Sequence, residues 1–398
     1  MAGFVSNVRT EISARMAPAL PAALRRRLVP AEYSWSYADL RPVARAKPGN
    51  TRLLIARANF ASQGYYWARA AETLPGVSAV NLAFGWAPEI AHIKPDVAVK
   101  GNVGRHSHLW ARKQRKAILR GFTHVLYEAE RPLLPTLYDG DLVAEINDLQ
   151  DHGIAIAMVS HGSDTRVPSR HVELEPYSPF VDPLGGLTAN LETSTRLNHQ
   201  ALDALGLPTY VSTPDLLLYR PEATWLPTLT DPQRWERLPA SAFGTRTPVV
   251  LHVPSRSALK GTAAISPAMR RLEHLGLIHY VEAERVPYED MPTMIARADI
   301  VIDQLSMALY GVASVEAMLA GRIVVAQAGQ HIRTHIARET GWDLPIVEAN
   351  PATISDVVED IATHPGHYRD RIEQGRRFAR EVHSDAAAAA ALEPFLLG

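Results

Sequence analysis

The sequence predicts an α/β protein with two domains, each built on a parallel sheet whose strands are joined by helices. Two observations predict this fold class. The chain has 398 residues, which is too long for one ordinary hydrophobic core and fits two domains of roughly 150 to 200 residues each. Along most of its length, short runs rich in Val and Ile alternate with stretches of helical periodicity. This alternation is typical of parallel strands with helical crossovers.

The composition is that of a globular protein. Hydrophobic residues make up 46% and charged residues 21% of the chain, which is enough to bury a sizeable core. There is no cysteine, so a disulfide framework, a thiolate nucleophile and a cysteine metal site are excluded, in agreement with a cytoplasmic location. No run of about 18 apolar residues is present to span a membrane, and the N-terminus lacks the apolar stretch of a secretory signal.

Two segments in the first third are basic, although the formal net charge of the chain is −1. Residues 1–47 contain eight Arg or Lys against three acidic residues, a net charge of +5, and residues 94–120 contain eight against one, a net charge of +7. Such segments predict a basic face. Residues 1–29 fit a basic amphipathic helix on an anionic membrane, at the inner face of the plasma membrane, and fit a surface extension equally well.

The first domain is expected over residues 48–225, after a basic extension of residues 1–47. Packed structure should begin at Arg52, where a buried strand runs into the polar loop 59–64. The further strands of this half are expected at residues 77–84, 123–128, 154–160 and 209–212, and its helices at residues 65–74, 106–120, 139–152 and 187–205.

Prolines interrupt every periodic pattern near the middle of the chain, which places a linker at residues 226–247. The second domain is expected over residues 248–380, followed at 381–398 by a C-terminal helix that packs back on the first domain, with the alanine-rich tract 386–392 extending the helix before it. The strands of this half are expected at residues 249–253, 278–282, 299–303 and 322–326, and its helices at residues 262–275, 290–297, 312–320, 331–339, 352–363 and 368–382.

Parallel sheets bind ligands at the carboxyl ends of their strands, and HVPSRSALKGT (252–262) follows such an end and opens a helix. Lys260 is a point charge at a helix start, where backbone N–H groups already favour an anion. Arg256 can add a bidentate phosphate contact. A capped helix with solvated basic residues explains the same motif, and both interpretations stay open.

The stretch 298–327, ADIVIDQLSMALYGVASVEAMLAGRIVVAQ, predicts a strand, a glycine turn at Gly311, a helix and a second buried strand. Glu316 lies within this helix between two hydrophobic strands. Because an unpaired buried carboxylate is costly, we expect Glu316 to have a dedicated partner. A capping or pairing role inside the helix is the alternative.

Together these motifs resemble the donor half of GT-B glycosyltransferases, particularly the large, mostly retaining family that uses nucleotide sugars. The resemblance rests on KGT after a strand, on Asp303 and Gln304 at the next strand end, and on YGxxxxEAMLAG from Tyr310. It implies two Rossmann-like domains facing across a cleft. It also implies a helix glutamate, here Glu316, that accepts both ribose hydroxyls of the donor.

The resemblance further assigns the diphosphate to Lys260 and Arg256. The arginine usually stands further upstream, and an earlier glutamate that often faces the transferred sugar is replaced here by Ala308. The donor-binding residues expected on this basis are Arg256, Lys260, Gly261, Thr262, Asp303, Gln304, Tyr310, Gly311 and Glu316.

A third strand end carries Ser160-His161-Gly162-Ser163-Asp164. By resemblance, His161 faces the transferred sugar, as a hydrogen-bond donor or as a base toward the acceptor hydroxyl, with Asp164 as its catalytic neighbour. The alternative is that His161 and Asp164 tie down a loop, with an Asp164–Arg166 ion pair.

Weaker signals lie at the other strand ends of the first half. Gln63 and Gly64 belong to the loop that the resemblance turns toward the diphosphate, and Gly64 permits close backbone approach. Glu128 is a candidate wall of the acceptor pocket. Loop capping explains these residues nearly as well.

Several motifs point away from other functions. Asp139-Gly140-Asp141 matches a metal-binding DxD, but it opens a helix without a preceding buried strand, so N-capping is the better interpretation and no essential metal is expected. There is no GxGxxG after a strand and no Walker lysine motif. The tryptophans are scattered, which argues against nucleic acid as a partner.

The sequence therefore predicts a metal-independent, retaining glycosyltransferase that needs no cofactor. Its expected substrates are a nucleotide sugar and a glycan, lipid-linked or small-molecule hydroxyl acceptor, in the synthesis of cell-surface polysaccharide or glycolipid. One alternative is a nucleotide-sugar epimerase or hydrolase on the same fold. Another is a non-catalytic sugar- or polysaccharide-binding protein, which Ala308 keeps open.

Overall fold

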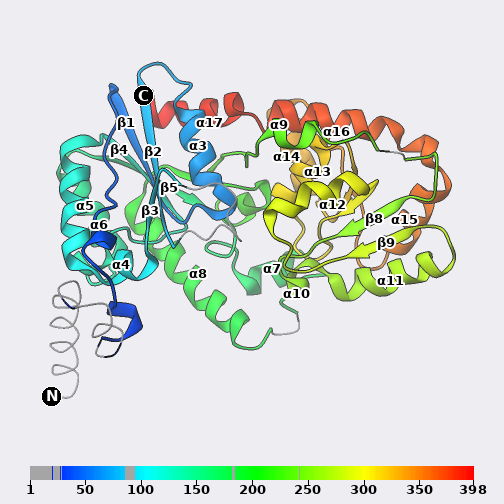
Figure 1. The fold of residues 1–398 in the computed structure, drawn as a ribbon, viewed down its shortest axis with the longest axis horizontal. Helices are drawn as coiled ribbons and strands as arrows, with labels where there is room; N and C mark the ends of the chain where they lie inside the picture. The colour runs from blue at the N-terminus through cyan, green and yellow to red at the C-terminus, as the bar shows by residue number, and fades with distance from the viewer. Residues whose placement is uncertain (1–19, 21–26, 28, 86–94, 182–183, 242) are drawn as a thin grey trace. The chain divides into compact units, whose positions relative to one another are not determined.

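The computed structural model describes residues 20, 27, 29–85, 95–181, 184–241 and 243–398 (Figure 1). The predicted amphipathic helix of residues 1–29 lies almost wholly outside the described residues. The chain forms two compact units. Unit 1 comprises residues 1–159, 200–209 and 392–398, and unit 2 comprises residues 160–199 and 210–391.

The larger sheet has seven strands in the order β3-β2-β1-β4-β5-β6-β7. Within it, β1 pairs in parallel with β2 on one side and with β4 on the other. The strands are β1 (Thr51–Arg57), β2 (Val77–Phe84), β3 (Val97–Val99), β4 (His124–Glu128), β5 (Ala155–Ser160), β6 (Thr209–Val211) and β7 (Thr224–Trp225). The helices between them are α3 (Gln63–Ala71), α4 (Gly101–His106), α5 (His108–Gly121), α6 (Leu142–Asp151), α7 (Pro168–Leu174) and α8 (Gly186–Leu205).

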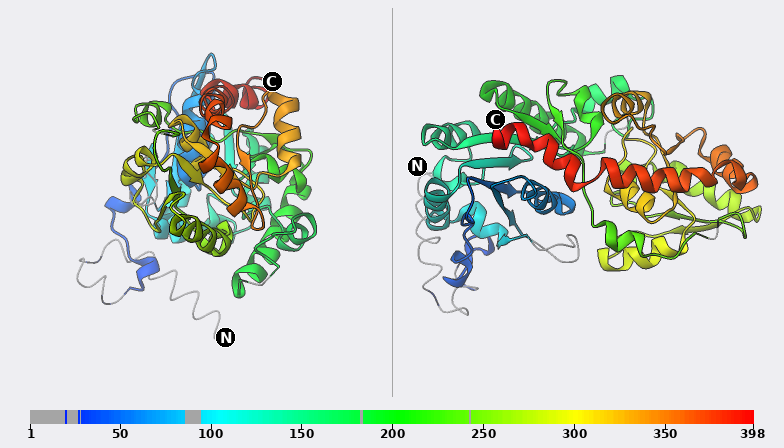
Figure 2. Two further views of the ribbon diagram at one scale, coloured as in Figure 1. Left: turned by 90° about the vertical axis from the view of Figure 1, so that its right-hand side faces the viewer. Right: turned by 90° about the horizontal axis from the view of Figure 1, so that it is seen from above.

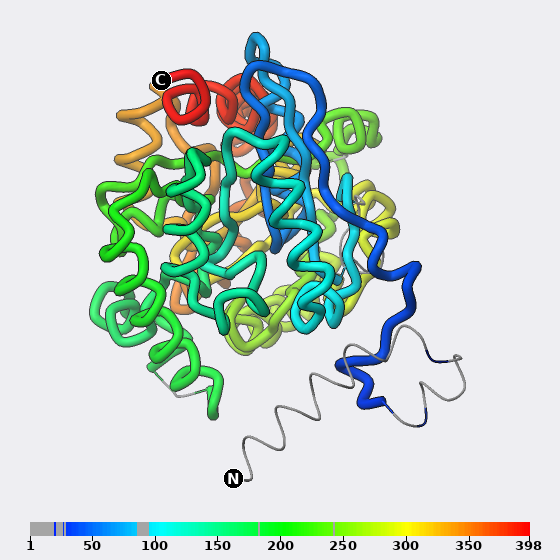
Figure 3. The backbone as a smooth tube through the Cα atoms, turned by 90° about the vertical axis from the view of Figure 1, so that its left-hand side faces the viewer, coloured from blue at the N-terminus to red at the C-terminus, as the bar shows by residue number. Residues whose placement is uncertain are grey.

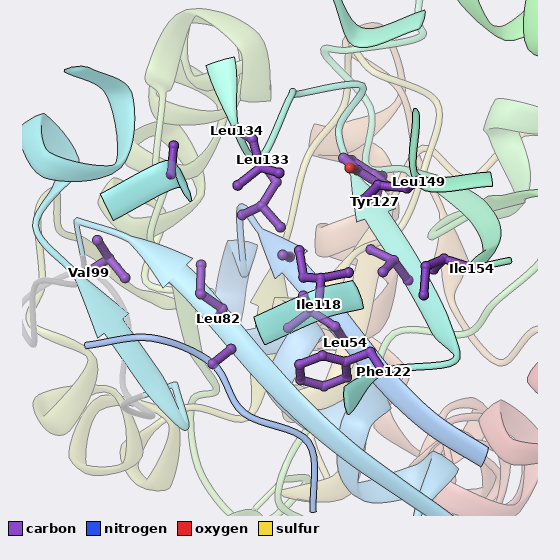
Figure 4. Packing of buried hydrophobic residues seen from close by; sticks show 14 of the residues in the cluster. Leu54, Leu82, Val99, Ile118, Phe122, Tyr127, Leu133, Leu134, Leu149 and Ile154 are labelled. Atoms are coloured by element: carbon purple, nitrogen blue, oxygen red, sulfur yellow. The ribbon is translucent and has the colours of Figure 1, made fainter. Parts of the chain in front are cut away.

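The core of unit 1 lies between this sheet and helices α4, α5 and α6. Leu54 and Leu82 from neighbouring strands pack against Ile118 and Phe122 at the end of α5 (Figure 4). Consecutive residues of β1 and β2 are buried, so both faces of these strands are covered, as expected of a parallel sheet with helices on both sides.

Residues 29–50 run along unit 1 before β1 begins (Figure 3). Trp35, Leu40 and Ala44 are fully buried members of the core. The prediction that packed structure begins at Arg52 is therefore wrong. The segment was missed because its anchoring residues are spaced too irregularly to form a helical or strand pattern.

Residues 40–46, which we call the strap, are bound to α5 by side chains. Trp110 donates through Nε1 to the carbonyl of Pro42 at 2.7 Å. Gln114 accepts from the Ala44 amide at 2.8 Å and donates to the Ala44 carbonyl at 3.3 Å. The strap is thus a hydrogen-bonded layer over the helix.

Unit 2 has a five-stranded sheet in the order β12-β11-β10-β8-β9. The strands are β8 (Val249–His252), β9 (His279–Glu282), β10 (Ile300–Ile302), β11 (Ile323–Ala326) and β12 (Val347–Glu348). The helices of this part are α9 (Pro232–Glu236), α10 (Ser257–Lys260), α11 (Thr262–His274), α12 (Met291–Arg297), α13 (Val312–Leu319), α14 (Gln330–Thr340), α15 (Ile354–Thr363), α16 (Arg369–Val382) and α17 (Asp385–Leu397).

The five-stranded sheet separates two cores, with helices on both of its faces (Figure 2). Ile300 and Ile302 point to α11 and α15, whereas Val301 between them points to α13 and α16. Successive side chains of a strand point to opposite faces, and here both faces are buried, so every position of the strand is apolar.

The expected strand, turn, helix and strand of the stretch 298–327 are confirmed as β10, α13 and β11 to within about a residue at each end. The alanine-rich tract does not extend α16, because the chain breaks at His383 and α17 begins anew at Asp385. Near its end, the Leu396 carbonyl accepts from Thr51 Oγ1 at 3.1 Å within unit 1.

Candidate functional site

The strand order of unit 2 reverses at β8, because the chain proceeds from β8 to β9 on one side and then to β10 on the other. In doubly wound sheets, the crevice at such a switch point, outside the carboxyl ends of the strands, is where ligands bind. The loops after β8 and β10 both begin there. They carry Lys260 and Asp303.

Lys260 and Asp303 form an ion pair at this point, with Lys260 Nζ 2.5 Å from Asp303 Oδ1. The Asp303 carboxylate also accepts from Ser314 Oγ at 2.7 Å and from the Gly311 amide at 3.3 Å, both at the start of α13. Its side chain is 2% exposed, against 21% for Lys260. The lysine is therefore the solvent-facing member of the pair.

The electrostatics of the pair follow from these contacts. Burial alone would raise the pKa of Asp303, but the charge of Lys260 and the hydrogen bonds from Lys260, Ser314 and Gly311 bring it below its usual value. Asp303 is thus ionised, and it anchors both the lysine and the N-terminus of α13.

Gly261 allows the two loops to approach. It has φ +78°, and a Cβ there would lie 2.8 Å from Ser306 Oγ and 3.2 Å from Leu305 Cβ. The adjoining Lys260 carbonyl accepts from the Leu305 amide at 3.0 Å. Any side chain at this position would push the loop after β10 away from Lys260.

Gln304 shapes the loop after β10. Its Oε1 accepts from the amides of Ser306 at 3.0 Å and Met307 at 2.7 Å, while its Nε2 donates to the carbonyls of Gln327 at 2.7 Å and Leu309. The side chain is fully buried. All these partners belong to the protein backbone, so Gln304 braces the loop.

Glu316 lies on α13, 4% exposed. Its Oε1 accepts from Tyr288 Oη at 2.7 Å and from Thr230 Oγ1 at 3.3 Å. Burial raises its pKa to about 7, against the two hydrogen bonds and the charge of Arg234, which lower it. The expected dedicated partner is confirmed, and within the described chain it is a pair of hydroxyl groups.

The remaining predicted donor residues divide into two groups. Thr262 lies at the same switch point, where its Oγ1 is 2.9 Å from Nε2 of the buried His252, and Arg256 is exposed just before α10. The Tyr310 hydroxyl does not contact Lys260. It lies 3.0 Å from Nε2 of His383, the residue that follows α16.

The loop after β5 is held by Asp164, whose carboxylate accepts from the His161 amide at 2.8 Å and from the Gly162 amide at 2.6 Å. The Asp164–Arg166 ion pair suggested as part of the alternative does not form among the described residues. Arg166 pairs instead with Asp215, and both side chains are buried. Asp164 thus ties the loop, and a chemical role for His161 stays a prediction.

In unit 1 the loops after β1 and β4 also meet at a switch point. The buried Glu128 accepts from the amides of Ala58 and Asn59 at 3.0 Å. A Cβ on Gly64 would lie 2.5 Å from Asn81 Nδ2 and 3.0 Å from Glu128 Oε1. Gln63, also buried, donates to the Ala61 carbonyl at 3.1 Å. These predicted residues come together, and their visible contacts brace the loop.

Two polar residues near the unit 2 site were missed by the sequence analysis. On and after α7, His171 Nε2 lies 3.3 Å from the Met307 carbonyl, and Glu175 accepts from Gln327 Nε2 at 3.3 Å. Burial lowers the pKa of His171 to about 4 and raises that of Glu175 to about 7. Helix α7 has seven residues, too few for periodicity to indicate it.

The described residues contain no group of three or more His, Asp or Glu side chains placed to hold a metal ion. In the described part of the chain, no helix is long and apolar enough to cross a membrane. A cavity of about 680 Å³ in unit 2, lined by Trp225, His335 and Trp342 among others, contains none of the predicted site residues.

Neither a protein-family model nor a curated protein sequence matches the chain. Several solved structures are similar to it. Sucrose-phosphate synthase from Thermosynechococcus elongatus is 13% identical with a TM-score of 0.57, over 86% of this chain and 97% of that one. The glycosyltransferase WaaG, involved in lipopolysaccharide biosynthesis, is 15% identical with a TM-score of 0.51, over 87% and 100%.

Anabaena HepE in complex with UDP-glucose is 11% identical with a TM-score of 0.53, over 86% of this chain and 98% of that one. At these identities the similarity concerns the fold. The chain has the two-domain α/β architecture of GT-B glycosyltransferases, as the sequence resemblance implied.

Proposed function

We propose that this GT-B chain binds a nucleotide-diphosphate sugar and transfers the sugar to a hydroxyl acceptor. The observation that carries the proposal is the Lys260–Asp303 pair at the switch point of unit 2, beside the N-terminus of the helix that bears Glu316. The HepE structure contains UDP-glucose, which supports a nucleotide sugar as the ligand class.

The donor end of the site would use the charge of Lys260 and the N-termini of two helices. Lys260 is held by Asp303 with part of its side chain exposed, so its ammonium can meet a diphosphate without losing its anchor. Backbone N–H groups at the starts of α11 and α13 add positive potential. These groups stabilise the diphosphate as it departs, which is where charge develops in the transition state.

Glu316 would accept the ribose hydroxyls. Among the described residues both of its hydrogen bonds reach Oε1, so Oε2 retains acceptor capacity. Charge-assisted hydrogen bonds of this type contribute roughly 1.5 to 3 kcal/mol each. Glu316 has a pKa of about 7, so hydrogen bonds from the ribose hydroxyls would favour its ionised form.

In the proposed reaction, the bond between the anomeric carbon and the diphosphate oxygen breaks and the acceptor oxygen bonds to that carbon. His161 positions the sugar or receives the acceptor proton. Metal independence and a retaining outcome belong to the proposal, as do a lipid-linked or other glycan acceptor, a role in cell-surface polysaccharide or glycolipid synthesis, and a location in the cytoplasm or at the inner face of the plasma membrane.

Isothermal titration with UDP, GDP and dTDP tests the donor site. We expect one of them to bind the wild type, and Lys260→Gln and Glu316→Gln each to weaken it at least tenfold. Glu339→Gln, an exposed site on α14, serves as the matched control. Unchanged affinity of all three nucleotides in both site variants would contradict the assignment.

Turnover separates the candidate functions. Release of nucleoside diphosphate that requires an acceptor supports transfer, whereas release or epimerisation of the donor without acceptor supports the hydrolase or epimerase. Nucleotide binding with no turnover over a broad acceptor panel would favour the non-catalytic binder. Ala308 keeps this last candidate open, because an alanine at that position offers no acid to face the sugar.

A further inference from the structure

Five basic side chains line one groove of unit 1. Arg41 and Arg45 come from the strap, and Lys113, Lys116 and Arg120 come from α5. The groove measures about 650 Å³, and between the charges its lining is apolar or backbone, including Val43 and Ala117. All five cations are exposed.

The shape of the groove is fixed by contacts between the strap and α5. The strap is held against α5 through Trp110 and Gln114, as described above, and a Cβ on Gly121 would lie 3.2 Å from the Ala46 Cβ. The two rows of cations therefore stand at a set separation, with little freedom for the backbone to move them apart.

The five charges are uncompensated within the described residues, where no ion pair or side-chain hydrogen bond engages any of them. Basic residues close to the groove, in contrast, form ion pairs. Arg115 on the same helix pairs with Asp148 at 2.7 Å, and Lys47 just past the strap pairs with Glu72 at 2.8 Å. The C-terminal dipole of α5 favours Lys116 and Arg120, but it does not account for the two strap arginines.

One face of α5 combines these charges with an exposed apolar side chain. Leu109, Lys113, Lys116 and Arg120 recur at helical spacing, which puts them on one face, and Leu109 is 49% exposed. A basic face with an exposed leucine is the composition of a helix that lies on an anionic bilayer.

We propose that this groove binds the phosphates of anionic lipid headgroups and so docks unit 1 on a membrane. Lys113 and Arg120 are about 10 Å apart along the helix, a span that suits an array of phosphates better than one free phosphate. The lining includes no aromatic ring on which a nucleic-acid base could stack. The proposal does not depend on sugar transfer.

Vesicle sedimentation of the full chain, without nucleotide sugar, tests the proposal. The vesicles are phosphatidylcholine alone or with 30 mol% phosphatidylglycerol, at low and high salt. The test variant is Lys113→Gln/Lys116→Gln/Arg120→Gln. The control, Arg270→Gln/Arg271→Gln/Arg297→Gln, removes three exposed charges from unit 2. Thermal unfolding checks that both variants are folded.

We expect wild type and control to bind the anionic vesicles and not the neutral ones, with binding lost at high salt. The test variant should lose roughly 100-fold in partition coefficient, about fivefold for each basic residue. Equal binding by test variant and wild type would overturn the proposal. So would tighter, groove-dependent binding of inorganic pyrophosphate or of single-stranded DNA than of the vesicles, since the ligand would then be a soluble phosphate or a nucleic acid.

Discussion

At the scale of single residues, Glu316 connects the packing of α13 to the proposed chemistry. Burial raises the pKa of this carboxylate to about 7, and it would go higher without the hydrogen bonds from Tyr288 and Thr230 and the charge of Arg234. Asp303 on the preceding loop is negative as well and raises the pKa of Glu316 further. The site thus contains one carboxylate paired with the Lys260 ammonium and a second whose hydrogen-bond donors are neutral hydroxyl groups.

This arrangement predicts how stability depends on pH. The pKa of Glu316 is about 7 in the folded protein against a usual value of 4.5, so between these values the folded state retains a proton that the unfolded state has released. The free energy of unfolding therefore falls as pH rises through this window. Glu316 contributes up to about 3 kcal/mol to the fall.

Glu316→Gln should remove that contribution, so that the variant loses less stability than the wild type between pH 5 and pH 8. Urea titrations at several pH values measure the difference. Glu339→Gln, at an exposed position, should follow the wild type. Parallel pH profiles for wild type and Glu316→Gln would show that burial does not perturb this group.

At the scale of secondary-structure elements, local capping decided between two interpretations of Asp139-Gly140-Asp141. Asp141 Oδ1 accepts from the amides of Val143 at 2.9 Å and Ala144 at 3.0 Å. It is the N-cap of α6, which confirms the capping interpretation.

Replacing this N-cap should lower the stability of the protein without affecting any metal binding. We expect Asp141→Ala to lower the free energy of unfolding by about 1 kcal/mol, measured by urea denaturation of the full chain. Asp139→Asn is the control, because Asp139 has φ +52°, a conformation that Asn tolerates. If Mn²⁺ stabilised the wild type and Asp141→Ala abolished that effect, a metal role would replace the cap.

Elements whose sequence pattern extends over many residues were predicted well, and several of the shortest strands were missed. The residue range 77–84 was expected as a strand and is β2, and 187–205 was expected as a helix and is α8 within one residue. Strands β3, β7 and β12 have two or three residues. A period cannot be recognised over so few positions, and these strands exist because a neighbouring strand offers its hydrogen bonds.

At the scale of the whole molecule, there are two parallel sheets with separate cores, and each sheet has a switch point with two loops meeting there. The loops differ in their charge. In unit 1 the buried Glu128 accepts from two backbone amides, whereas in unit 2 the Lys260 ammonium remains partly exposed. These contacts favour unit 2 as the location of the proposed anion binding.

Calorimetry of the intact chain tests this division. A nucleotide at a hundred times its dissociation constant should stabilise unit 2 by about 2.7 kcal/mol and raise the unfolding temperature of the transition that contains it. Lys260→Gln should abolish the increase at the same nucleotide concentration. An increase that persists in Lys260→Gln would place the nucleotide elsewhere.

The sequence by itself determined the alternation of strands and helices, the strand ends that carry polar residues, and the need of Glu316 for a partner. These features depend on local periodicity and on the cost of burying charge. Only the tertiary structure decided which polar residues meet. Lys260 and Asp303 are 43 positions apart and become neighbours because β8 and β10 are adjacent in the sheet. Arg166 finds Asp215 rather than Asp164, and the strap joins α5, for the same reason: partners distant in sequence are chosen by strand order and packing, which no local pattern records.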